Sequence, residues 1–147
     1  MATIKSYTDL EQSKKLAEIL PFESTDMCLT FVNNMWNPVW GKADDIYQLH
    51  KNNYEPDYTK DEYIDFDEYE PKVVPCWSLA TLSEFILPYI ADDNGNNYKF
   101  YLSKDGLDRW IAYYKSGDVS IYICEESDNM IDVIFEMVCW LKKEEYI

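Results

Sequence analysis

The chain has 147 residues, of which 47% are hydrophobic, and acidic side chains outnumber basic ones by 28 to 13, for a net charge of −15. This length suits a single domain over residues 1–147, whose core needs no disulfide or metal to support it. Direct nucleic-acid binding is not expected because the negative surface repels phosphate backbones, and no apolar run reaches the roughly 20 residues of a membrane span.

The first predicted element is a helix that ends at Pro21. Thr8 and Glu11 have the spacing of a capping box, in which each side chain accepts a hydrogen bond from the other residue's backbone. Leu16 and Leu20 lie on the apolar side of this helix. Pro21 ends it because a proline disfavours the helical conformation of the residue before it.

Three segments of different composition follow this helix. The short apolar run Met27–Val32 predicts a strand, whereas Asn33–Gly41 holds two tryptophans among turn-forming residues and is interpreted as a loop. Residues 44–72 are acidic, rich in tyrosine and poorly periodic, so we expect a long surface excursion. Its weakly alternating stretch Tyr63–Asp67 predicts an edge strand.

The second half predicts helices on both sides of a meander. A helix is expected over Pro75–Pro88, with Ser78 as its N-cap, and another near Asn129–Glu145, capped by Ser127 or Asp128. Between them, alternating residues and tight turns predict strands over Tyr98–Ser103, Arg109–Tyr114 and Val119–Cys124. The sequence therefore predicts an α+β fold, a three- to four-stranded antiparallel meander with about three helices packed on one face.

Residues that often carry catalysis or bind metals are few and belong to no motif. His50 is the only histidine, and it lies in a polar stretch that we interpret as surface. The cysteines have neither zinc-site nor disulfide spacing, which predicts free thiols in apolar surroundings. They are Cys28, Cys76, Cys124 and Cys139. We therefore expect no cofactor and no metal site, and the absence of an apolar leader segment predicts a cytoplasmic protein.

The acidic, tyrosine-rich stretch is the most unusual part of the sequence. Its composition fits a solvated, mobile loop, but it also fits a recognition surface, because carboxylates pair with basic side chains while tyrosines add contact area. Such a surface imitates the phosphates of a nucleic acid and would suit a basic partner protein. The candidate interaction residues are Asp57, Tyr58, Asp61, Glu62, Tyr63, Asp65, Asp67, Glu68, Tyr69 and Glu70.

Several stretches together resemble small uncharacterised proteins of phages, prophages and mobile elements of gut Bacteroidetes. They are residues 6–21 with 23–27, the segment Pro75–Ala80, and the pairs Glu136-Met137 and Trp140-Leu141. The resemblance implies a phage-type accessory protein in the cytoplasm of a bacterial host. It implies no activity, so it assigns no role to any residue.

The leading hypothesis is a non-enzymatic accessory protein that acts by protein–protein interaction and inhibits a host nucleic-acid-binding or defence factor by acidic mimicry. The alternative is a small-molecule-binding or sequestering protein. Its pocket would be lined by Trp36, Trp40, Trp77 and Trp110. A third hypothesis, less favoured than either, is a metal-assisted hydrolase that uses surface carboxylates.

Overall fold

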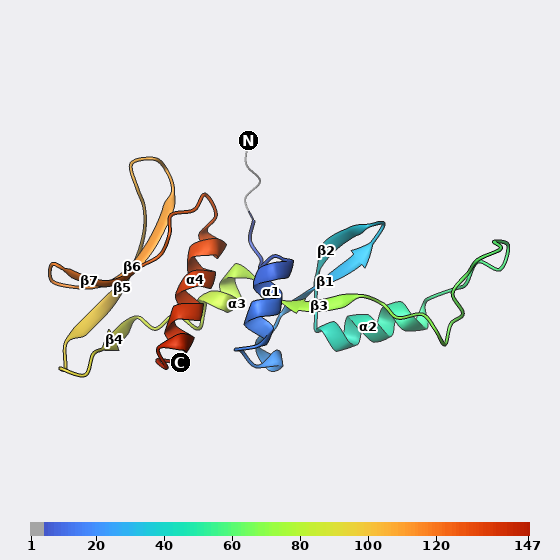
Figure 1. Cartoon of the computed structure of the whole chain (residues 1–147), viewed down its shortest axis with the longest axis horizontal. Coiled ribbons are helices and arrows are strands. Elements are labelled where there is room, and N and C mark those ends of the chain that lie inside the picture. The colour runs from blue at the N-terminus through green and yellow to red at the C-terminus, as the bar shows by residue number, and fades with distance from the viewer. Residues whose placement is uncertain (1–4) are drawn as a thin grey trace.

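Two antiparallel sheets lie on either side of a group of helices in the computed structural model, which describes residues 5–147 (Figure 1). Their strand orders are β2-β1-β3 and β4-β5-β6-β7. The strands are β1 Met27–Val32, β2 Met35–Trp40, β3 Val73–Cys76, β4 Tyr89–Ala91, β5 Asn97–Lys104, β6 Trp110–Ser116 and β7 Val119–Ile123. The helices are α1 Leu10–Ala17, the short 3₁₀ helix Phe22–Ser24, α2 Ala43–Asn52, α3 Leu79–Ser83 and α4 Met130–Lys143. The α+β class and the meander are confirmed, and a second sheet is added.

The predicted loop Asn33–Gly41 is wrong, because most of it forms strand β2. Asn33 and Asn34 both have positive φ, 53° and 62°, which is the conformation of a tight hairpin turn whose twist matches its strands. β2 therefore folds straight back on β1, from Val32 opposite Met35 at the turn to the far ends of both strands.

The surface excursion is shorter than the predicted 44–72. Its first part is helix α2, which lies alongside β3 and β1, and its last residues lead into β3 on the other side of β1. Ala43 is the one buried residue of α2, and Ile46 and Tyr47 share its side of the helix at helical spacing, a pattern that the acidic composition of the segment conceals. Residues 63–67 form no strand, contrary to prediction, since their backbone pairs with no other strand.

The predicted helix Pro75–Pro88 shrinks to the five residues of α3. Its expected N-cap is confirmed, since the Ser78 side chain accepts a hydrogen bond from the Thr81 amide at 3.2 Å. The start of that segment belongs to β3, and the residues after Pro88 form β4, which adds a fourth strand beside β5.

The residues that cap α1 differ from the prediction by one position. Asp9 is the N-cap, and its carboxylate accepts from the Gln12 amide at 2.8 Å while Gln12 accepts from the Asp9 amide at 3.1 Å. Thr8 is instead fully buried, and its hydroxyl accepts a hydrogen bond from the Trp77 amide at 3.1 Å. A tertiary contact therefore replaces the local cap expected for Thr8.

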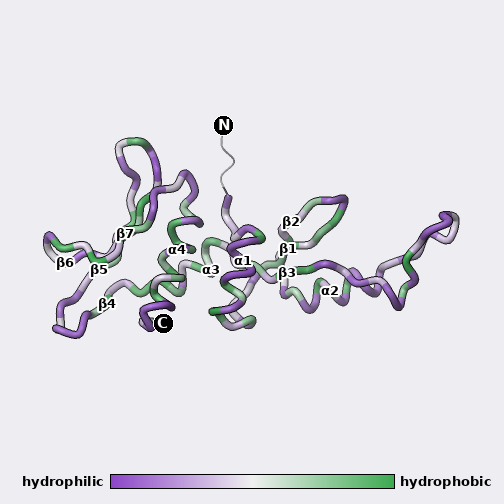
Figure 2. The backbone as a smooth tube through the Cα atoms, in the orientation of Figure 1, coloured by the Kyte–Doolittle hydropathy of each residue, from purple (hydrophilic) through white to green (hydrophobic). Residues whose placement is uncertain are grey.

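Helix α4 lies between the helices α1 and α3 on one side and the four-stranded sheet on the other. One flank packs with α1 and α3 through Ile131, Ile134 and Val138, and the other packs on the four-stranded sheet through Val133, Met137 and Leu141. Each of these side chains is at most 2% exposed. Burying one aliphatic side chain of this size contributes roughly 1.5–3 kcal/mol as an upper estimate. Figure 2 shows the corresponding concentration of hydrophobic residues along α4.

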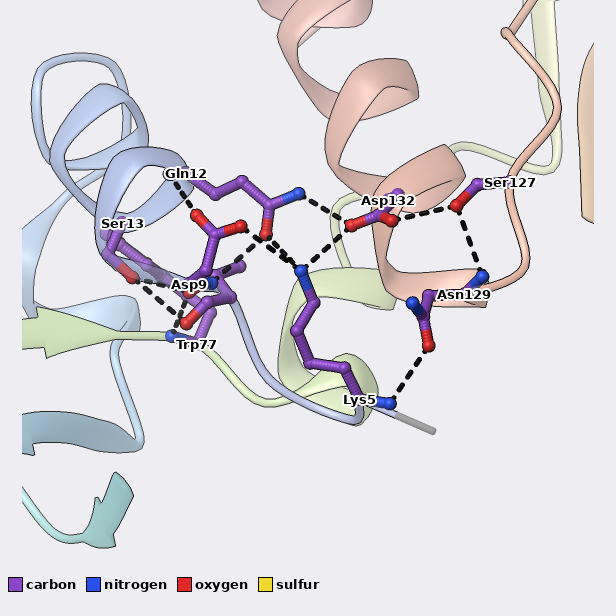
Figure 3. A network of polar contacts seen from close by, with 9 residues as sticks. Lys5, Asp9, Gln12, Ser13, Trp77, Ser127, Asn129 and Asp132 are labelled. Atoms are coloured by element: carbon purple, nitrogen blue, oxygen red, sulfur yellow. Dashed lines mark hydrogen bonds and ion pairs between the residues drawn. The ribbon is translucent and has the colours of Figure 1, made fainter. Parts of the chain in front are cut away.

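A polar network joins the first turns of α1 and α4 (Figure 3). The Lys5 ammonium donates to Asp9 at 3.2 Å and to Asp132 at 3.0 Å, and the Gln12 amide group donates to Asp132 at 2.8 Å. Ser127 donates to the second oxygen of Asp132 at 2.8 Å, so Ser127 does not cap α4 as predicted, and Asn129 is the N-cap. Asp132 thus holds the two helix starts in register.

Replacing Asp132 by asparagine is predicted to lower the free energy of unfolding by about 1–2 kcal/mol near pH 7, because hydrogen bonds to a charged group contribute more than neutral ones. Burial raises the pKa of Asp132, but hydrogen bonds from Gln12, Lys5 and Ser127 outweigh it and leave the pKa below its ordinary value. The stabilisation is therefore complete above the ordinary aspartate pKa and is lost as the pH falls through the lower, folded-state pKa.

Urea unfolding near pH 7 and near pH 3 measures both effects. The control is Asp93→Asn, which removes an equal charge from an exposed turn residue and is expected to change stability by less than about 0.5 kcal/mol. Equal stability of the two variants near pH 7 would contradict the role assigned to Asp132.

Candidate functional site

Residues 53–70, which form most of the chain between α2 and β3, project from one end of the molecule and are called the acidic arm below (Figure 1). It carries eight carboxylates and one lysine, a net charge of −7 out of the −15 of the whole chain. The carboxylates are Glu55, Asp57, Asp61, Glu62, Asp65, Asp67, Glu68 and Glu70. Nearly half of the negative surplus is therefore gathered on one exposed segment, which Figure 2 shows as mainly hydrophilic.

Helix α2 holds the base of the acidic arm in place. The Lys51 ammonium donates hydrogen bonds to the backbone carbonyls of Phe66 and Tyr69 and lies 5.0 Å from the centroid of the Phe66 ring. The rings of Tyr54 and Tyr69 stack with centroids 3.8 Å apart, and the Tyr54 hydroxyl donates to the carbonyl of Ile64 at 2.6 Å. These contacts fold the returning half of the arm back onto the helix end.

The outer part of the acidic arm presents aromatic rings among its carboxylates. Tyr58 and Tyr63 meet edge to face with centroids 4.8 Å apart, and they are 66% and 47% exposed. Ile64 and Phe66 are also more than 40% exposed. The exposed apolar area thus comes from both rings and aliphatic groups, which is the mixture found in interface anchors.

The carboxylates of the acidic arm divide into two groups. Asp57 accepts hydrogen bonds from the Thr59 side chain and amide, which lower its pKa, and Glu70 accepts from the Tyr47 hydroxyl at 2.5 Å. The others form no hydrogen bond or ion pair with any residue in the range 5–147. This second group comprises Glu55, Asp61, Glu62, Asp65, Asp67 and Glu68. Its charges are free to meet another molecule.

Of the ten candidate interaction residues, only Tyr69 is not exposed, because it stacks on Tyr54. Tyr69 therefore supports the arm. Ile64 and Phe66 were missed as exposed apolar residues, since their alternation with Asp65 and Asp67 was interpreted as a strand. Lys51 of α2, whose ammonium donates to two backbone carbonyls of the arm, belongs to no motif, so its supporting role could not be predicted.

The structure does not bring the four tryptophans of the small-molecule hypothesis together. Trp77 is fully buried and donates to the Ser24 hydroxyl at 2.9 Å, while Trp110 belongs to β6 of the other sheet. Trp40 is 68% exposed on β2 and lines a groove that includes neither Trp36 nor Trp77. That predicted pocket is therefore wrong.

Histidine, cysteine and acidic side chains are the residue types from which a metal site or a nucleophile could be built. Among residues 5–147, no group of three or more histidine, cysteine or acidic side chains is placed to hold a metal ion. Cys28, Cys76 and Cys124 are buried as expected, and Cys139 is half-buried. Burial raises the pKa of Cys76 to about 12, so this thiol is protonated at neutral pH and is a poor nucleophile.

None of the helices within residues 5–147 combines the length and the apolar composition needed to cross a membrane. Comparison of the chain with protein-family models, with curated proteins and with solved structures finds no match. The resemblance described from the sequence therefore remains an expectation.

Replacing Tyr69 by alanine is predicted to loosen the returning half of the acidic arm. Loss of the stack with Tyr54 removes about 1 kcal/mol, so hydrogen exchange of the amides over residues 64–70 should speed up about fivefold while the melting temperature changes little. Hydrogen–deuterium exchange with mass spectrometry measures this. Tyr63→Ala is the control, because Tyr63 contacts a ring of the outer arm rather than α2; unchanged exchange in Tyr69→Ala would show that the stack does not hold the arm.

Proposed function

We propose that this protein is a non-enzymatic interaction protein whose acidic arm binds a basic surface of a partner protein. The observation that supports the proposal is the group of unpaired carboxylates on the arm, with the exposed rings of Tyr58, Tyr63 and Phe66 between them. An array of like charges without counter-ions destabilises the isolated protein slightly, and a cationic partner removes that repulsion.

Charge and aromatic area have different roles in the proposed contact. Exposed ion pairs contribute little affinity each, about 0.2–1 kcal/mol, but a negative patch accelerates the encounter with a positive surface. Tyrosine and phenylalanine supply most of the binding energy when a partner buries them. The arm combines both, so it suits specific recognition rather than simple charge attraction.

The partner class proposed is a protein whose basic surface normally binds nucleic acid. Carboxylates spaced along a projecting segment take the place of backbone phosphates, and the arm then competes with the nucleic acid for the same lysines and arginines. In the phage-type setting that the resemblance implies, such a partner is a host nucleic-acid-binding or defence factor, and the protein acts as its inhibitor.

Neutralising four acidic-arm residues tests the proposal. The variant Asp61→Asn/Glu62→Gln/Asp65→Asn/Asp67→Asn should bind its partner about tenfold more weakly, since four exposed contacts of roughly 0.4 kcal/mol each are lost. Immobilised protein is exposed to nuclease-treated bacterial lysate, and captured proteins are eluted with duplex DNA and quantified.

The matched control removes four charges from exposed residues elsewhere in the chain. It is Asp93→Asn/Asp118→Asn/Glu144→Gln/Glu145→Gln, which has the same net charge as the arm variant. The control should retain the DNA-eluted proteins. If both variants lose the captured proteins equally, net charge alone explains the binding. If neither salt nor DNA releases the captured proteins, acidic mimicry is ruled out.

A further inference from the structure

A trough of about 570 Å³ runs over the outer face of α4, away from the acidic arm, with walls from α1 and β7. Its apolar lining comes from Phe135, Cys139 and Trp140 of α4, Ile19 beyond the end of α1, and Tyr122 of β7. This volume lies within the range of small-molecule sites, about 300–1,000 Å³. Three separate elements thus form a hollow of ligand size that the acidic arm does not reach.

The floor of the trough contains stacked aromatic rings and follows α4. Trp140 stacks on Tyr122 with ring centroids 4.6 Å apart, and Tyr146 packs against Trp140 at 5.6 Å. Along α4, the residues from Phe135 to Lys143 span about 12 Å of helix axis. The shape therefore fits a narrow apolar chain lying parallel to the helix.

The ends of the trough are cationic. Lys15 lies at the Phe135 end, with its ammonium 5.7 Å from the ring centroid, and Lys142 and Lys143 lie in the last turn of α4. All three lysines line the trough, and none forms an ion pair with a residue in the described range 5–147, although the chain has 28 acidic residues. An apolar floor is thus bordered by three lysines that no carboxylate of the described residues 5–147 pairs with.

The only carboxylate of the lining is already engaged. Glu136 accepts the Tyr122 hydroxyl at 2.9 Å with one oxygen and the Glu125 amide at 2.9 Å with the other. Glu136 keeps its negative charge, but the three lysines outnumber it, so the lining is net positive toward a ligand. A complementary ligand has an apolar body and a negatively charged end.

We propose that this trough binds an amphiphilic organic anion, an elongated apolar chain that ends in a carboxylate. The chain lies on Phe135 and Trp140, and the carboxylate pairs with lysine at one end of the trough. Apolar contact supplies most of the affinity, and the lysines select an anion over a neutral molecule of the same length.

Cys139 provides a reporter inside the trough. Cys28, Cys76 and Cys124 are at most 2% exposed, so iodoacetamide modifies Cys139 first in the folded protein. Decanoate, used below its micelle concentration, should slow the alkylation of Cys139 at least fivefold, as measured by mass spectrometry of the intact chain and its peptides. Decan-1-ol, which has the same chain without the charge, should protect much less.

Charge variants assign the protection to the lysines. Lys15→Gln/Lys142→Gln/Lys143→Gln should weaken decanoate binding about tenfold or more, whereas Lys14→Gln/Lys99→Gln/Lys115→Gln, with the same net charge, should bind it as the natural chain does. Absence of protection by decanoate, or equal protection by decan-1-ol, would overturn the proposal. Equal decanoate binding by both variants would also overturn it. Protection of Cys139 that grows with protein concentration in the absence of decanoate would do the same, because a second copy of the chain would then cover the trough.

Discussion

Helix α4 buries apolar side chains on two flanks at once, and it thereby joins α1 and α3 to the four-stranded sheet. Ile134 and its neighbours meet α1 and α3, whereas Met137 and its neighbours meet the four-stranded sheet. Apolar burial alone would tolerate sliding between these layers. The hydrogen bonds around Asp132 fix where α1 starts relative to α4. Apolar packing therefore holds the two helices together, and these directional contacts set their register.

The sequence predicts well the elements whose apolar residues recur at the spacing of one type of secondary structure. The stripe on α4 reflects burial on one side of the helix, and both α4 and β7 were predicted within one or two residues, although Val119 and Ile123 of β7 are more than half exposed. β2 was missed because Asn33 and Asn34 make its turn without glycine. α2 was missed because the helical spacing of Ala43, Ile46 and Tyr47 lies in a stretch dominated by acidic side chains. The cap at Thr8 moved because the Trp77 amide donates to that hydroxyl.

Composition located the candidate interaction segment but could not divide its residues by role. Tyr54 and Tyr69 differ from Tyr58 and Tyr63 only in their contacts with each other and with α2, which depend on how the chain folds back. The trough over α4 was not predicted from the sequence. Most of its lining lies on α4, but Lys15, Ile19 and Tyr122 join that lining only when α1 and β7 pack against the helix.

The three-stranded sheet ends on both sides in a strand that contains proline. Pro38 lies in β2 and Pro75 lies in β3, and these are the two edges of that sheet. Proline has no amide hydrogen to donate, so an approaching strand from another copy would meet a gap in either ladder. Both edges of the sheet that lies next to the acidic arm therefore disfavour pairing with a strand of another copy.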